Sequence, residues 1–183
     1  MQTKTLVLKL IFLGCSLSQA IAAPIEDQLF GVKLGSDPAA LERVHKGLYV
    51  HRLRLGEVLH EACNQKSLEV FTFSEEAWSP ARITDISVRL ESDVSVCRDS
   101  TGQLPDLAIE PRTPRGLALG DSRDAVIQKY GKPSEERPGM LVYRDVQVPP
   151  DAQVTNLQLF IEVRADKVAG ISLSGDIPGV KKP

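Results

Sequence analysis

The chain has 183 residues, of which 42% are hydrophobic and 25% are charged, and its formal net charge is −2 at pH 7. These proportions are ordinary for a globular protein of one or two small domains. The chain is weakly acidic and has no basic stripe interleaved with aromatic residues, which a nucleic acid backbone would require. We therefore do not expect nucleic acid as a partner.

The N-terminus has the pattern of a secretory signal over residues 1–22. Lys4 and Lys9 precede the apolar run Leu10–Gly14, and small residues follow as far as Ala22, after which we expect cleavage. The apolar run is too short to cross a bilayer, and no later stretch approaches the roughly 20 apolar residues that a membrane helix needs. We expect a periplasmic or secreted protein without a transmembrane segment in its mature chain.

Cys15 gives an alternative for the N-terminus. The sequence Phe12-Leu13-Gly14-Cys15 resembles the lipidation box of bacterial lipoproteins, although phenylalanine stands where leucine is usual. A lipid on Cys15 would make the protein an anchored structural subunit of the envelope. Otherwise Cys15 leaves with the signal.

The first structured region begins with an extended lead-in and a helix. Asp37 is a suitable N-cap, Pro38 suits the first helical position, and Lys46-Gly47 would end the helix. Three stretches with the alternation of strands follow, and Gly56–Lys66, between the first two, is expected to form a short helix. The expected strands are Leu48–Leu55, Leu68–Phe73 and Ile83–Val88.

Cys63 and Cys97 are the two thiols outside the signal, and an even number in an exported protein predicts a disulfide. A loop of this size would add about 3–4 kcal/mol to stability in the chain-entropy model. The competing interpretation, a reactive thiolate, needs an electropositive and accessible setting that the sequence does not show.

The second structured region follows a proline-containing linker at 98–113. Ser122 or Asp121 can cap a helix within Gly116–Pro133, and Gly131 followed by Pro133 ends it. The segment Lys132–Pro138 lengthens the turn that follows. The expected strands are Met140–Val148, Leu157–Glu162 and Val168–Leu173, and residues 177–183 form a tail.

The two regions look like copies of one unit. The phrases GVKLGSDPAALERVHKG and GLALGDSRDAVIQKYGKP lie 85 residues apart. The matched positions include Gly31, Leu34 and Gly35 in the first phrase and Gly116, Leu119 and Gly120 in the second. The sequence predicts an α+β fold of two tandem repeats, at 23–97 and 114–176, each a short helix followed by a three-stranded antiparallel meander.

The glycine-flanked phrase and the meander resemble the repeat of SmpA/OmlA-type envelope lipoproteins, the β-lactamase-inhibitor-protein-like family. The resemblance covers most of residues 29–97 and 114–175. Members often have two helices before the sheet, whereas one is clear in each half of this chain. The resemblance implies a non-catalytic, inhibitor-like protein that binds another protein in the bacterial cell envelope or outside it.

Strand alternation then predicts aromatic rings on the sheet face away from the helices. We expect Val70, Val88 and Val142 under the helices, which sends the rings to the other face. Either the two repeats or two chains bury these rings against each other, or the rings form a platform for a partner. Trp78 belongs to this platform or caps the core edge. The candidate binding residues are Tyr49, His51, Phe71, Phe73, Trp78, Tyr143 and Phe160.

The alternative from another class is a hydrolase or a metal-dependent enzyme that uses His51, Glu57 and His60. These residues have no standard metal-ligand spacing, and His60-Glu61 lacks the second histidine of a zincin helix. The chain also has no nucleophile elbow, phosphate-binding glycine loop or dinucleotide fingerprint. We therefore expect no catalytic residues, no metal and no cofactor.

Overall fold

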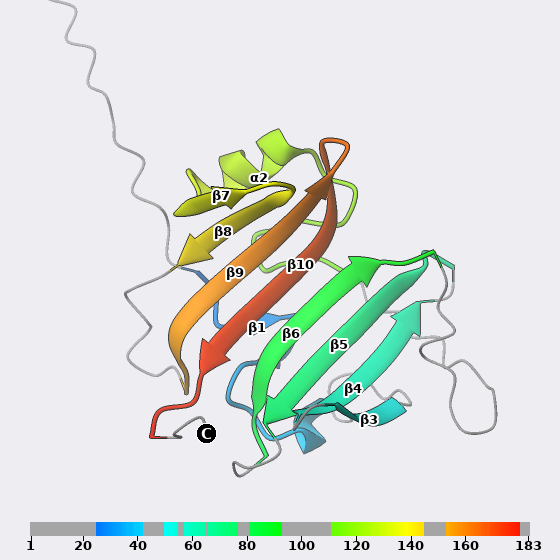
Figure 1. Ribbon diagram of the computed structural model, residues 1–183, viewed down its shortest axis with the longest axis vertical. Coiled ribbons are helices and arrows are strands. Elements are labelled where there is room, and N and C mark those ends of the chain that lie inside the picture. Colours follow the sequence, from blue (N-terminus) through cyan, green and yellow to red (C-terminus); the bar gives the residue numbers. More distant parts are fainter. Residues whose placement is uncertain are drawn as a thin grey trace, which may run out of the picture.

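The computed structural model describes residues 25–41, 50–54, 57–64, 66–76, 81–92, 111–144 and 153–179, with the backbone alone for 50–54 and 76. Eight strands form one antiparallel sheet in the order β3-β4-β5-β6-β10-β9-β8-β7, and β1 and β2 form a separate hairpin (Figure 1). The elements are β1 (Gln28–Leu29), β2 (Val32–Lys33), β3 (Val50–Arg54), β4 (Glu57–Asn64), β5 (Glu69–Glu76), β6 (Ile83–Leu90), α2 (Arg123–Tyr130), β7 (Glu135–Arg137), β8 (Met140–Arg144), β9 (Thr155–Arg164) and β10 (Lys167–Asp176).

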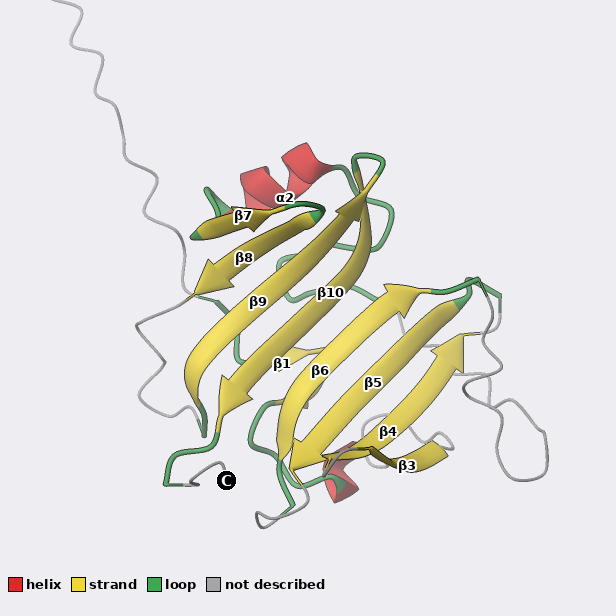
Figure 2. Cartoon of the chain, viewed as in Figure 1, coloured by secondary structure: helices red, strands yellow, loops and turns green. Residues whose placement is uncertain are grey.

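The expectation of an α+β fold built from a helix and a three-stranded meander is wrong. The described chain is mostly strand (Figure 2), each half contributes four strands, and the halves share one sheet because β6 pairs with β10. Gly56–Lys66, expected as a helix, instead contains β4, which pairs along its whole length with β5. Lys132–Pro138, expected as a turn, contains the edge strand β7.

The six expected strand segments all overlap observed strands, and the expected second helix is confirmed as α2. Ser122 is its N-cap, because the Ser122 hydroxyl accepts a hydrogen bond from the Ala125 N–H at 3.2 Å. Gly131 ends the helix with φ at 78°, in the left-handed region that glycine adopts without strain. In the first half, Asp37 Oδ1 accepts from the Ala39 N–H at 2.8 Å, as expected of a cap.

Two glycine turns hold the starts of β6 and β10. Gly35 donates its N–H to the carbonyl of Ile83 at 2.7 Å, and Gly120 donates to Val168 at 2.8 Å. In both halves the strand residue donates back to the residue after the glycine, at 3.0 and 2.8 Å. Both glycines have positive φ, 78° and 84°. The same local turn therefore fixes the two strands at the centre of the sheet.

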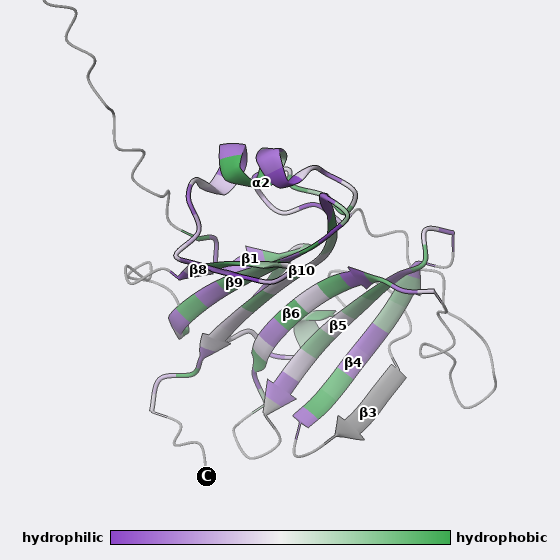
Figure 3. Ribbon diagram, turned by 45° about the horizontal axis from the view of Figure 1, so that its top comes forward, coloured by the Kyte–Doolittle hydropathy of each residue, from purple (hydrophilic) through white to green (hydrophobic). Residues whose placement is uncertain are grey.

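One face of the sheet, the core face, carries the hydrophobic core. The hairpin β1–β2 and helix α2 lie on this side (Figures 1 and 3). The Phe30 ring meets the Phe71 ring edge-on, with centroids 5.4 Å apart. The buried cluster includes Leu29, Val32 and Leu34 near the hairpin, Val126 and Tyr130 from α2, and Phe71, Phe73, Ile86, Val88, Leu159, Ile161, Ile171 and Leu173 from the sheet. We call the opposite side the outer face.

A polar cluster ties the N-terminal lead-in to the end of α2. Arg115 Nε donates to Glu26 Oε1 at 2.8 Å, and the Arg115 guanidinium lies 4.8 Å from the centre of the Tyr130 ring. Arg115 Nη1 also donates to the Lys129 carbonyl, and Lys129 Nζ donates back to the Arg115 carbonyl, both at 3.1 Å. The Tyr130 ring contacts Tyr143, with centroids 5.6 Å apart.

Stability is expected to fall at alkaline pH because of Tyr143. Burial raises the pKa of Tyr143 to about 12, with Arg123 opposing the rise and Glu136 adding to it. An unfolded phenol has a pKa of about 10, so the stabilisation is present below about pH 10 and is lost as the pH rises toward about 12. Burial raises the pKa of Tyr130 as well, with the same sign.

Urea unfolding at pH values from about 8 to about 11.5 tests this prediction. Tyr143→Phe removes the hydrogen bond from the hydroxyl to the Gly131 carbonyl (3.1 Å) and is expected to cost about 1 kcal/mol at pH 8. The same variant should lose less stability than wild type on going to alkaline pH. An equal decline in both proteins would show that Tyr143 does not contribute.

Candidate binding site

Three of the seven expected binding residues, Phe71, Phe73 and Tyr143, lie on the core face instead of the outer face. Phe71 is the register partner of Val88, and Phe73 is the partner of Ile86. Directly opposed residues of an antiparallel pair share a face, so these rings lie on the core face, where both are 0% exposed. Their expected outer position is wrong.

Tyr143 is also a core residue. It lies opposite Leu159 and is 3% exposed, and Leu141 lies on the same face opposite Ile161. Val142, expected under the helix, is on the outer face instead, opposite Phe160. Tyr49 and Trp78 lie outside the described residues, and of His51 the structure gives the backbone alone.

Phe160 does lie on the outer face, and it lines a groove there. Phe160 is half-buried. It is the register partner of Ser172 on β10. Ser172 in turn lies opposite Ser87 on β6, and Ser87 lies opposite Thr72 on β5. These pairings form a row across β9, β10, β6 and β5. A parallel row of outer-face residues runs Met140, Glu162, Gly170, Arg89.

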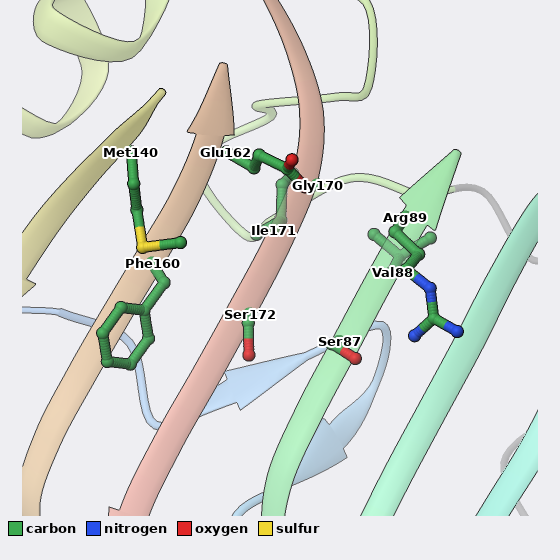
Figure 4. A pocket seen from close by; sticks show the side chains of 9 residues that line it. All are labelled: Ser87, Val88, Arg89, Met140, Phe160, Glu162, Gly170, Ile171 and Ser172. Carbon is green, nitrogen blue, oxygen red and sulfur yellow. The ribbon is translucent and has the colours of Figure 1, made fainter. Parts of the chain in front are cut away.

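The outer-face groove has a volume of about 200 Å³ between two walls (Figure 4). Phe160 and Met140 form one wall, and Arg89 stands on the opposite side. The serines at 87 and 172 lie between the walls. The groove is thus apolar on one side, cationic on the other and lined with hydroxyls in between.

Small residues on β10 leave space for the groove. A Cβ atom added at Gly170 would lie 3.2 Å from Glu162 Oε2, so glycine lets the Glu162 side chain lie over β10. Glu162 Oε1 accepts from Arg164 Nε at 2.8 Å. On the far wall, Arg89 Nε donates to Glu91, and the Arg89 side chain is 39% exposed. Each wall therefore carries a charged group held by a neighbour.

The outer face is more open over β6, β9 and β10 than over the middle of β4 and β5. On β4 and β5 the outer-face residues Glu61, Cys63 and Val70 are at most 4% exposed. On β6, β9 and β10, by contrast, Ser87, Phe160 and Ser172 are half-buried. The groove therefore lies in an accessible part of the outer face, together with Asp85, Gln158 and Ser174, which are also half-buried.

The structure separates Glu57 from His60, two residues of the enzyme alternative. Glu57 and His60 are three positions apart on β4, so they lie on opposite faces of the sheet. His60 Nε2 is 2.9 Å from Glu75 Oε1, and both side chains are buried on the core side. His51 is the register partner of His60. Within the described ranges, no three His, Cys, Asp or Glu residues form a group that could hold a metal ion.

Several N-terminal and linker predictions fall where the structure describes nothing. The signal at 1–22, Cys15, Cys97 and most of the linker lie outside the described residues, and so does the end of the tail. Cys63 is fully buried, and its pairing with Cys97 stays a prediction. Among the described residues, no helix is long and apolar enough to cross a membrane.

Sequence reasoning missed most of the groove. Arg89, Met140, Glu162 and the small residues of β10 were not candidates. The signal that could have found them is the spacing of Gly170, Ser172 and Ser174, which places a line of small residues on one face of an expected strand. Which face this is depends on pairing with β6 and β9, and sequence spacing alone does not give that.

Comparison with known proteins identifies no relative of this chain. No protein-family model matches the chain, and no curated protein or solved structure is similar enough to count as a match. The resemblance to the SmpA/OmlA-type repeat therefore stays a prediction from the sequence.

Proposed function

We propose that this protein is an exported, non-catalytic binding module of the cell envelope, and that it engages another protein through the outer-face groove. The observation that carries the proposal is the half-buried apolar wall that Phe160 and Met140 form on an open sheet face. A solvated sheet face is normally polar, and exposed apolar surface beside polar groups marks interaction sites. Aromatic residues are also enriched among binding hot spots.

The scaffold behind the groove supports this role. The lining residues come from four neighbouring strands, and a continuous core packs against the opposite side of the sheet. Binding to such a preorganised surface avoids the cost of ordering loops. The groove is therefore suited to recognition without a conformational change.

The β7 edge of the sheet is less suited to binding a partner strand. This edge strand has three residues, and Glu135 accepts from Arg137 at 2.6 Å and from Arg144 at 2.8 Å. Short and charged edge strands resist the addition of another strand. The face rather than this edge is the better docking surface.

Photo-crosslinking in the source cells tests the proposed binding surface. A photoreactive amino acid at Ser172 is expected to give a discrete adduct with another protein, and Phe160→Ala should reduce that adduct at least about tenfold. The matched control is the same amino acid at Asp124, an exposed residue of α2 on the other side of the sheet. Equal adducts from both positions, or an adduct insensitive to Phe160→Ala, would refute the proposal.

The export part of the proposal has a separate test. Mass spectrometry of the mature protein is expected to find an N-terminus at Ala23. A diacylglyceryl group on Cys15 would instead establish an anchored envelope protein. An uncleaved chain starting at Met1 would contradict export through a signal peptide.

A further inference from the structure

We infer that the groove accepts a single aromatic side chain, tyrosine in particular, projected by the protein partner. This inference rests on the proposed function. It adds the chemistry of the group that the partner must supply. Three features of the groove favour such a side chain: the spacing of the strands, the groups on the two walls and the small volume.

The strand spacing leaves room for one ring. Phe160, Ser172 and Ser87 are successive register partners on β9, β10 and β6, and neighbouring strands are about 4.8 Å apart. A ring above Ser172 would lie about 5 Å from Phe160, within the range of about 4.5–7 Å for aromatic pairs. A cation on the side of β6 would lie within about 6 Å of the same ring.

The walls carry the groups that such a ring uses. Figure 4 shows the Arg89 guanidinium beside Ser87, on the side of the groove opposite Phe160. It also shows the sulfur of Met140 next to the Phe160 ring, where a thioether can contact a second aromatic group. An inserted ring would thus have an aromatic and thioether surface on one side and a cation on the other.

The remaining groups favour tyrosine over an aliphatic side chain. The hydroxyls of Ser87 and Ser172 and the carboxylate of Glu162 line the groove, and a phenolic hydroxyl can donate to them or accept from the serines. A leucine side chain would cover these polar groups without bonding to them, which costs free energy. A leucine side chain would also make no cation–π contact with Arg89.

The size of the groove indicates a side chain rather than a small molecule. A volume of about 200 Å³ is below the roughly 300–1,000 Å³ of typical ligand pockets. One residue on a protruding loop of a partner fits this space.

A second copy of the chain fits less well. To place Phe160 of each copy over Ser172 of the other, a twofold axis must run along the strands between β9 and β10. Glu162 and Gly170 face each other across the same two strands, and Glu162 reaches over Gly170. The two Glu162 side chains would then meet on the axis, with like charges and overlapping atoms. The structure therefore favours a different protein as the partner.

Chemical-shift mapping with N-acetyl amino acid amides tests the inference on the full mature protein. We expect the tyrosine and phenylalanine amides to shift the backbone signals of Gly170 and Ser172, with tyrosine the tighter, while the leucine amide binds at least about threefold more weakly and the lysine amide not at all. Phe160→Ala should abolish the shifts. Arg89→Gln should weaken tyrosine binding about two- to fivefold, as expected for an exposed cation–π contact, and leave leucine unchanged.

The matched control is Arg137→Gln, an exposed arginine of β7 outside this groove, which should change nothing. Leucine binding as tightly as tyrosine, or no amide shifting Gly170 and Ser172, would overturn the inference. So would a wild-type dimer in sedimentation that Phe160→Ala dissociates, because the groove would then hold a second copy. If the Ser172 adduct still depends on Phe160 but none of the amides shifts the signals of Gly170 and Ser172, the proposed binding function is supported and the inferred aromatic specificity is wrong.

Discussion

Gly35→Ala is expected to destabilise the protein by about 2–5 kcal/mol, whereas Gly120→Ala should cost about 1–2 kcal/mol. Both glycines have positive φ, 78° and 84°, and each donates its N–H to the start of a central strand. Alanine in this left-handed conformation costs about 1–2 kcal/mol at either position. The difference between the two variants therefore comes from the space around each glycine.

The surroundings of the two turns differ sharply. A Cβ atom at Gly35 would lie 2.5 Å from the Cβ of Gln153 and 3.2 Å from its carbonyl oxygen. At Gly120, a Cβ atom would meet no atom within 4 Å. Because the contact at Gly35 is with the base of a side chain and with backbone, the segment before β9 would have to move. Overpacking of this kind typically costs about 1–3 kcal/mol.

Urea unfolding of the two alanine variants and the wild type measures both effects. Gly120→Ala serves as the control, because it has the same strained φ and the same hydrogen bond without the contact. Equal losses of unfolding free energy in the two variants would show that the segment around Gln153 moves away from the new methyl group without a free-energy penalty.

Helix α2 could be predicted because its determinants are local. The cap at Ser122 and the end at Gly131 follow from residues within a few positions of one another. These hydrogen bonds and backbone conformations within one segment do not depend on where the segment lies in the fold. The sequence reasoning was accurate here for that reason.

The face of each strand could not be predicted, because burial on β5 is not limited to one face. Val70 and Phe71 are neighbours on β5, and both are 0% exposed. Alternation gives no preference between them, so the sequence alone does not decide whether Val70 or Phe71 faces the helix. The pairing of Phe71 with Val88 on β6, 17 positions away, decides which side faces the core.

Pairing over distance also explains the missed strands. In Glu57–Asn64, the apolar residues Val58, Leu59 and Ala62 have spacings of one, three and four, which suit a helix as well as a strand. The segment is a strand because β3 and β5 flank it. Glu135–Arg137 has no residue that favours strands, and it pairs with β8 across the tight turn at Gly139, where φ is 72°.

The groove escaped prediction for a related reason. Met140, Phe160 and Ser172 come from the consecutive strands β8, β9 and β10, and Arg89, about 50 positions earlier on β6, joins them only because β6 pairs with β10. No local pattern encodes that junction between the two halves. Phe160 is predicted as a binding residue because it is an aromatic residue on an expected strand. The other residues of the groove have no such feature in the sequence.

Phe71→Ala is expected to cost about 3–5 kcal/mol of unfolding free energy, whereas Phe160→Ala should cost no more than about 1 kcal/mol. Phe71 is fully buried, and its removal leaves a cavity beside Phe30 and deprives that ring of an edge-on contact at 5.4 Å. Phe160 is half-buried on the open face, so water can occupy much of the space that its ring leaves. The sequence alone treats these two rings as equivalent binding candidates.

Denaturant unfolding combined with the Ser172 crosslinking assay separates the two roles. Phe160→Ala is expected to keep the unfolding midpoint near that of wild type while losing the adduct, and Phe71→Ala to shift the midpoint strongly. A cycle with Phe30→Leu should give a coupling of about 0.5–1.5 kcal/mol for the Phe30–Phe71 pair and none for Phe30 with Phe160. If Phe160→Ala destabilised the protein as much as Phe71→Ala, the ring at 160 would be a packing residue, and loss of the adduct would no longer identify a binding surface.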